Sequence, residues 1–145
     1  MKKFFLTAAI LVLAFGSACA DIDRPIEVKD LPVKAQSFLK QHYPSIQVSL
    51  AIEDKEFLFN EFEVVLVNGI KLDFDSSGEW IEVDCKYDSV PSAVVPLQIQ
   101  QDVAKRYPDA KIIKIKRERR GYEVSLSNRL ELSYDSKFKV VEIDD

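Results

Sequence analysis

The chain has 145 residues, with 20 Lys or Arg and 24 Asp or Glu, so its formal net charge at pH 7 is −4. This length fits one domain or two small repeats that share a core. The acidic balance argues against nucleic-acid binding, which normally uses a basic surface with interleaved stacking aromatics. A Ser-His-Asp or Cys-His mechanism would have to use His42, the single histidine. We therefore predict a protein that is not an enzyme.

The first twenty residues have the pattern of a secretory signal peptide. A basic start precedes an apolar run at 4–15, and the small residues Ala18 and Ala20 suit a cleavage site. Two outcomes are open: cleavage after Ala20, or lipidation of Cys19 as in bacterial lipoproteins. Gly16 stands where a lipidation motif usually has Leu, which favours cleavage. We predict a periplasmic or secreted protein, with a lipoprotein anchored through Cys19 as the alternative. The rest of the chain has no apolar segment long enough to span a membrane.

The next segments predict a short helix that recurs later in the chain. Residues 21–30 are polar and suggest an extended lead-in. Between Pro32 and Pro44, apolar residues recur at helical spacing, and proline suits the first turn of a helix but not its interior. The same pattern returns between Pro96 and Pro108. Both segments therefore predict amphipathic helices.

Two stretches predict β-hairpins. Residues 62–75 and 122–135 each contain two alternating apolar–polar runs, which is typical of strands with one buried face. Asn68-Gly69 joins the first pair, and Asn-Gly is the strongest short hairpin signal. Arg129 replaces the glycine in the second pair. Since Arg disfavours positive φ, we expect that turn to be looser or of a different type.

The combined pattern resembles a known family. Leu-Pro, a helix and Tyr-Pro precede alternating strands and the motif Tyr/Phe-Glu-Val-x-Leu-x-Asn-Gly-x-x-Leu-x-Phe-Asp-x-x-Gly-x-Trp. This is similar to the PepSY-like, or beta-lactamase-inhibitor-like, family of small secreted proteins of Gram-negative bacteria, from Leu31 to Ile143. In the second copy Lys137 replaces Gly78. The resemblance implies an α+β fold: a tandem repeat of a helix plus about four antiparallel strands, with the helices on one face of the sheet. It implies a binding or inhibitory role and supplies no catalytic residues.

The expected organisation follows from these patterns. We predict a signal peptide at 1–20, an extended lead-in at 21–30, one PepSY-like repeat at 31–86, a linker at 87–94 and a second repeat at 95–145.

One segment imitates a calcium-binding loop. Its candidate ligands are Asp73, Asp75, Ser77 and Asp84. However, Asp73 lies within a strand pattern, and no predicted helix flanks the loop. We interpret the segment as a turn and predict neither a metal site nor a cofactor. Cys85 shares alternation with apolar neighbours and is interpreted as a small buried residue.

The face of the sheet opposite the helices is the candidate binding surface. Strand alternation places three aromatic and three acidic residues there: Phe57, Phe59, Trp80, Glu61, Glu63 and Glu82. A bulge that returns the aromatic side chains to the core is the open alternative. We predict a periplasmic, non-enzymatic module that contacts an envelope or secreted protein or peptide through this face. A small-molecule-binding sensor of the envelope is the alternative, and an enzyme of unrecognised type ranks below both. The oligomeric state is not predicted.

Overall fold

The computed structural model describes residues 22–55 and 59–145. The predicted signal peptide, with Cys19, and the candidate surface residue Phe57 lie outside the described residues. Within those residues, no helix is long and apolar enough to cross a membrane.

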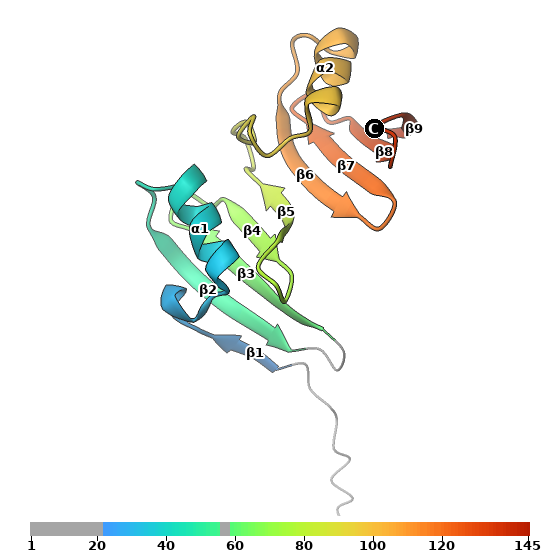
Figure 1. The fold of residues 1–145 in the computed structure, drawn as a ribbon. Coiled ribbons are helices and arrows are strands. Elements are labelled where there is room, and N and C mark those ends of the chain that lie inside the picture. The colour runs from blue at the N-terminus through green and yellow to red at the C-terminus, as the bar shows by residue number, and fades with distance from the viewer. Residues whose placement is uncertain (1–21, 56–58) are drawn as a thin grey trace, which may run out of the picture.

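Strands and helices follow one another along the chain as Figure 1 shows. The elements are β1 Ile22–Pro25, the 3-10 helix η1 Val28–Asp30, α1 Val33–His42, β2 Val48–Lys55, β3 Asn60–Leu66, β4 Lys71–Phe74, β5 Trp80–Asp84, α2 Leu97–Arg106, β6 Ile112–Glu118, β7 Gly121–Leu126, β8 Glu131–Asp135 and β9 Val140–Asp144.

The described strands form one antiparallel sheet of nine strands in the order β1 to β9. The predicted tandem repeat of a helix plus about four strands is therefore wrong, although the fold is α+β overall. One continuous sheet with two short α-helices replaces it, because β5 and β6 pair directly through Glu82–Asp84 and Lys114–Lys116. Pairing satisfies backbone groups that an open edge of β5 would expose. Residues 22–25, in the predicted lead-in, add β1 at one edge.

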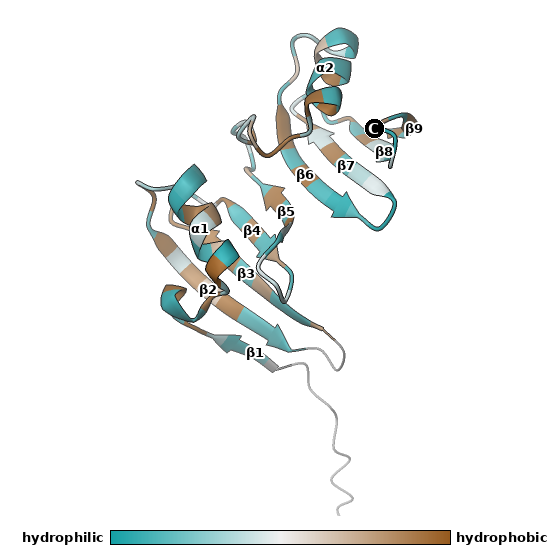
Figure 2. Cartoon of the chain, viewed as in Figure 1, coloured by the Kyte–Doolittle hydropathy of each residue, from teal (hydrophilic) through white to brown (hydrophobic). Residues whose placement is uncertain are grey.

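One side of this sheet carries the core. Directly opposed residues of an antiparallel pair lie on the same face. A row of six such residues, all fully buried, crosses β3 to β8: Val64, Leu72, Val83, Ile115, Val124 and Leu132. Apolar and polar residues alternate along the strands, as the brown and teal bands show (Figure 2). The core therefore continues across the junction between β5 and β6.

Both helices cover this core face. Proline occupies the N-cap of each, and a tyrosine amide at each C-cap bonds to the last turn. Helix α1 buries Ala35 and Leu39, and α2 buries Ile99 and Val103. Phe38 also packs edge-on against Phe74 of β4, with ring centroids 5.5 Å apart. The opposite face of the sheet has no helix over it in the described part of the chain (Figure 1).

The two hairpin turns have the same geometry, contrary to expectation. Gly69 and Arg129 both have positive φ, 89° and 75°. Each donates its amide to the residue three positions earlier, at 2.9 and 3.0 Å. In the second turn the Asn128 carboxamide oxygen also accepts a hydrogen bond from the Leu130 amide at 3.1 Å. We attribute the shared geometry to this asparagine, whose counterpart Asn68 makes the same bond to Ile70.

A β-bulge places Trp80 in the core, so the expectation that it lies on the open face is wrong. The register of β4 and β5 shifts between Asp73 and Phe74, and Trp80 lies opposite Phe74. One additional residue reverses the alternation beyond it. Trp80 is consequently 8 % exposed, and the Arg117 guanidinium lies 4.1 Å from its ring centroid.

Candidate binding face of the sheet

Two rows of side chains run across the strands on the face opposite the helices. We call them the acidic row and the mixed row. The register of successive strand pairs defines the acidic row as Ile52, Glu63, Asp73, Glu82, Lys116, Glu123, Ser133 and Glu142. It defines the mixed row as Leu50, Val65, Lys71, Asp84, Lys114, Ser125, Glu131 and Asp144.

Carboxylates dominate this face. Across the two rows, eight carboxylates stand against three ammonium groups: Glu63, Asp73, Glu82, Asp84, Glu123, Glu131, Glu142 and Asp144 against Lys71, Lys114 and Lys116. Apolar side chains occur only at the β2 and β3 end of the two rows, where Leu50, Ile52 and Val65 lie side by side. The face therefore has a strongly negative surface with an apolar border.

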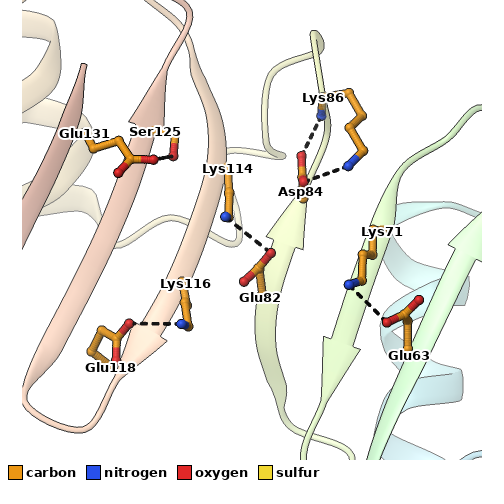
Figure 3. Close-up of polar contacts among 10 residues, drawn as sticks. All are labelled: Glu63, Lys71, Glu82, Asp84, Lys86, Lys114, Lys116, Glu118, Ser125 and Glu131. Carbon is orange, nitrogen blue, oxygen red and sulfur yellow. Dashed lines mark hydrogen bonds and ion pairs between the residues drawn. The ribbon is translucent and has the colours of Figure 1, made fainter. Parts of the chain in front are cut away.

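Lysines neutralise part of the charge, as Figure 3 shows. Lys71 Nζ lies 3.0 Å from a Glu63 carboxylate oxygen, and Lys114 Nζ lies 3.5 Å from Glu82. The hydrogen bond to Glu63 is the largest cause that raises the pKa of Lys71. Lys116 is directed to Glu118, at 3.3 Å, although Glu82 is its partner across the strands. Such partly exposed pairs contribute little to stability, about 1 kcal/mol or less each.

Asp73 lies in an environment that is unfavourable for a charge. Its cross-strand neighbours are Glu63 on one side and Glu82 on the other. Burial, partly opposed by Lys71, raises the pKa of Asp73 to about 6, and the nearby carboxylates of Glu82, Glu63 and Glu61 add to the rise. Like charges placed directly opposite destabilise a sheet. The three adjacent carboxylates of β3, β4 and β5 therefore cost the fold stability.

A hollow of about 200 Å³ lies beside Asp73. We call it the acidic hollow; it is lined by Asp23, Ile52, Asp54, Glu61, Phe62, Glu63 and Asp73. Its carboxylates come from four strands, β1 to β4. The hollow therefore places several acceptor oxygens around one space at the β1 end of the face.

The structure separates the predicted surface residues. Glu63 and Glu82 lie on the open face on either side of Asp73, and Glu61 borders the acidic hollow. Phe59 is 66 % exposed, next to β3. Trp80 is on the other side of the sheet. Whether the exposed residues contact a partner stays a prediction. Sequence reasoning missed Asp73 as a member of this surface, although its alternation with the buried Leu72 was a usable signal.

The calcium-like loop forms a turn. The Asp75 Oδ1 atom accepts hydrogen bonds from the Ser77 amide at 2.9 Å, the Ser77 hydroxyl at 2.6 Å and the Glu79 amide at 3.0 Å. Asp84 accepts hydrogen bonds from the amide and the ammonium group of Lys86, both at 2.9 Å. Within residues 22–55 and 59–145, no three His, Cys, Asp or Glu side chains are grouped so as to hold a metal ion.

A second hollow, of about 360 Å³, lies beside the mixed row at β7 and β8. Its lining includes Lys86, Tyr87, Ser125, Arg129 and Glu131. Glu131 accepts a hydrogen bond from the Ser125 hydroxyl at 3.2 Å (Figure 3). Because charges of both signs line this hollow, it differs from the acidic hollow at the opposite end.

Fold and surface together define a small α+β protein with one helix-covered face and one open, acidic face. The family model described as "Putative beta-lactamase-inhibitor-like, PepSY-like" matches residues 60–142. The chain belongs to this PepSY-like family, as the sequence resemblance indicated. A comparison with curated proteins found no match.

Three solved structures support the assignment. One is described as a "putative periplasmic protein from DUF2874 family" of Bacteroides vulgatus; it is 47 % identical, covers 87 % of this chain and 99 % of its own, and has a TM-score of 0.84. A "putative calcium-regulated periplasmic protein" of Bacteroides thetaiotaomicron is 49 % identical, with coverages of 85 % and 97 % and a TM-score of 0.82. A "putative periplasmic protein of unknown function" of Bacteroides vulgatus is 35 % identical, with coverages of 86 % and 100 % and a TM-score of 0.81.

Proposed function

We propose that this chain is a non-enzymatic binding module of the bacterial periplasm whose open sheet face contacts a protein or peptide partner. The periplasmic descriptions of three related proteins support the location. The inhibitor-like description of the family supports a role in binding.

The acidic row supplies the main support for a contact surface. Glu63, Asp73 and Glu82 are adjacent across three strands, and the pKa of Asp73 is raised to about 6. Proteins tolerate unfavourable electrostatics of this kind mostly where function requires it. A lysine or arginine of a partner, placed over Asp73, would relieve the repulsion. The proposed partner therefore presents a basic contact surface.

The apolar border supports the same assignment. Leu50 is 41 % exposed and lies beside Val65 at the β2 and β3 end of the face. Interfaces combine apolar groups with polar ones at the rim. Since Trp80 is buried, it is not proposed as the anchor, and Asp73 takes that place. The loss of a desolvated charged anchor typically weakens binding about thirtyfold or more.

Capture of envelope proteins by the mature chain, followed by mass spectrometry, provides the test. The variant Asp73→Asn/Glu82→Gln removes two charges from the face. The control Asp88→Asn/Asp109→Asn removes two exposed charges elsewhere. The proposal is supported if a partner is retained by wild type and control but lost by the face variant. Calorimetry should then show that the partner binds wild type and control more tightly than the face variant. Equal retention by both variants refutes it.

Calcium regulation is not carried over from the 49 % identical protein. In the calcium-like loop, Asp75 and Asp84 are engaged in hydrogen bonds within turns. The part of the chain that the structure describes contains no group of acidic, His or Cys side chains suited to a metal ion.

We also propose that the mature chain begins at Asp21, after cleavage behind Ala20. The intact mass of the native protein tests this. A mass that includes a lipidated Cys19 would show an anchored lipoprotein, and a retained Met1 would contradict both forms of processing.

A further inference from the structure

Strand β9 leaves one edge of the sheet open. It is last in the strand order, and in the described part of the chain no strand pairs with its outer side. An edge strand presents unpaired N–H and C=O groups that can accept another strand. At the opposite edge, β1 has only four residues and contains Arg24 and Pro25, which discourage pairing. Strand β9 contains neither Pro nor Lys.

Strand β9 closely matches β5 in sequence and register. Glu82, Val83 and Asp84 of β5 correspond to Glu142, Ile143 and Asp144 of β9. Each set pairs with the preceding strand in the same way: Asp73, Leu72 and Lys71 lie opposite the first set, and Ser133, Leu132 and Glu131 lie opposite the second. Both pairs also contain a bulge near the start of the later strand. The two strands therefore offer the same outer edge.

In β5 that edge is already occupied by β6. Lys116 lies opposite Glu82, and Lys114 lies opposite Asp84. Lys114 Nζ comes within 3.5 Å of a Glu82 oxygen (Figure 3). Ile115 lies opposite Val83, and both are fully buried. A Lys-Ile-Lys strand is thus the partner that this acid–aliphatic–acid edge accepts within the protein.

In β9 the equivalent groups face solvent. Ile143 is 43 % exposed, although its counterpart Val83 is fully buried, and the neighbouring Val141 is 65 % exposed. Glu142 and Asp144 are exposed as well. The edge of β9 therefore has the charge and the apolar surface of β5, without the strand that covers them.

We propose that the edge of β9 binds an extended peptide segment of the pattern basic–aliphatic–basic as a tenth, antiparallel strand. The two basic side chains lie opposite Glu142 and Asp144, and the aliphatic one covers Ile143. Strand addition supplies backbone hydrogen bonds, and the alternate side chains give specificity. The inference goes beyond the proposed function, because it concerns the sheet edge and not the Asp73 region of the face.

A second copy of this chain does not meet these requirements. Pairing two β9 strands would bring Glu142 and Asp144 of one copy near those of the other, and like charges across strands repel. Strand β6, which has the required pattern, is already paired with β5 and β7. The segment must therefore come from another protein.

A synthetic peptide with the sequence of residues 111–119, acetylated and amidated, is the probe. Titration into the ¹⁵N-labelled chain should give saturable chemical-shift changes in residues 138–145 and slower hydrogen exchange of the β9 amides. The variant Glu142→Lys/Asp144→Lys should bind at least about tenfold more weakly, because two favourable cross-strand pairs become repulsive. The control Asp88→Lys/Asp109→Lys changes the net charge equally and should bind as wild type does.

A second peptide separates strand addition from general attraction between charges. It carries Pro in place of the central Ile, equivalent to Ile115, so it keeps every charge but cannot pair as a strand. It should lose binding. The proposal is overturned if both peptides bind equally, if neither binds saturably, or if the β9 variant binds as wild type does. Chemical-shift changes centred on Asp73 would also overturn it. So would dimers with protected β9 amides in sedimentation and hydrogen-exchange experiments.

Discussion

Replacement of Asp73 by Asn should stabilise the fold at neutral pH. The side chain lies between Glu63 and Glu82 in the acidic row, and burial is the first cause that raises its pKa to about 6. Asn has nearly the same shape and carries no charge. The variant therefore removes an unfavourable charge without creating a cavity.

The size and sign of the effect follow from the pKa of Asp73. Its ordinary value is 3.8. Because the folded state holds the proton more tightly than the unfolded state, stability falls as the pH rises from about 4 to about 6. A pKa raised from 3.8 to about 6 corresponds to a loss of about 3 kcal/mol in the free energy of unfolding. Since the side chain keeps partial contact with water, screening reduces the expected gain to about 1–2 kcal/mol at pH 7.5.

Urea denaturation at pH 7.5 and pH 4 measures this effect. Asp73→Asn should raise the free energy of unfolding at pH 7.5, and most of the gain should disappear at pH 4. Asp75→Asn is the matched control. Burial acts to raise the pKa of Asp75, but hydrogen bonds from Ser77 and Glu79 outweigh it, so the pKa is lowered. That variant should lower the free energy of unfolding at pH 7.5, and its difference from wild type should be smaller at pH 4. A loss of stability in Asp73→Asn at pH 7.5, or a gain that persists at pH 4, would refute the reasoning.

Three further predictions concern the core and the turns. Phe38→Ala should lower the free energy of unfolding by about 3 kcal/mol, since it removes a ring packed on Phe74; an unchanged urea midpoint would contradict this packing. Trp80 should show blue-shifted fluorescence that acrylamide quenches weakly, because it is 8 % exposed; emission at the wavelength of free tryptophan would place it in water. Gly69→Ala should cost only about 1 kcal/mol, from its positive φ. Gly78→Ala should lower the free energy of unfolding by more in the same urea assay, because an added Cβ would also lie 2.8 Å from Cβ of Pro32. Equal losses in the two variants would exclude that contact.

The local elements could be predicted from sequence because their signals are local. Prolines mark the ends of both helices, and alternation marks the hairpins around Asn68 and Asn128. The second turn was predicted incorrectly because the prediction considered the φ preference of Arg129 alone. The Asn128 side chain bonds to the Leu130 amide and supports the turn despite the positive φ that Arg129 adopts.

Continuity of the sheet could not be predicted in this way. The pairing of β5 with β6 joins residues about thirty positions apart, and the helix α2 lies between them. Hydrophobic periodicity identifies which side of a strand is buried, but it does not identify the neighbouring strand. The lysines opposite Glu82 and Asp84 were visible in the sequence, but their register became apparent only from the strand pairing.

Bulges explain why the candidate surface was only partly predicted. Alternation assigns a side chain to a face only while the ladder is regular, and one additional residue reverses every assignment beyond it. Trp80 precedes such a bulge in β5 and faces the core, whereas Glu82, after the bulge, keeps its predicted face. The same reversal in β2 places Val48 on the core face and Leu50 on the open one.

The acidic row itself depends on the register of every strand pair, since Glu63, Asp73 and Glu82 become neighbours only through two successive pairings. A surface formed by side chains across strands is therefore a property of register, which short-range sequence patterns do not determine.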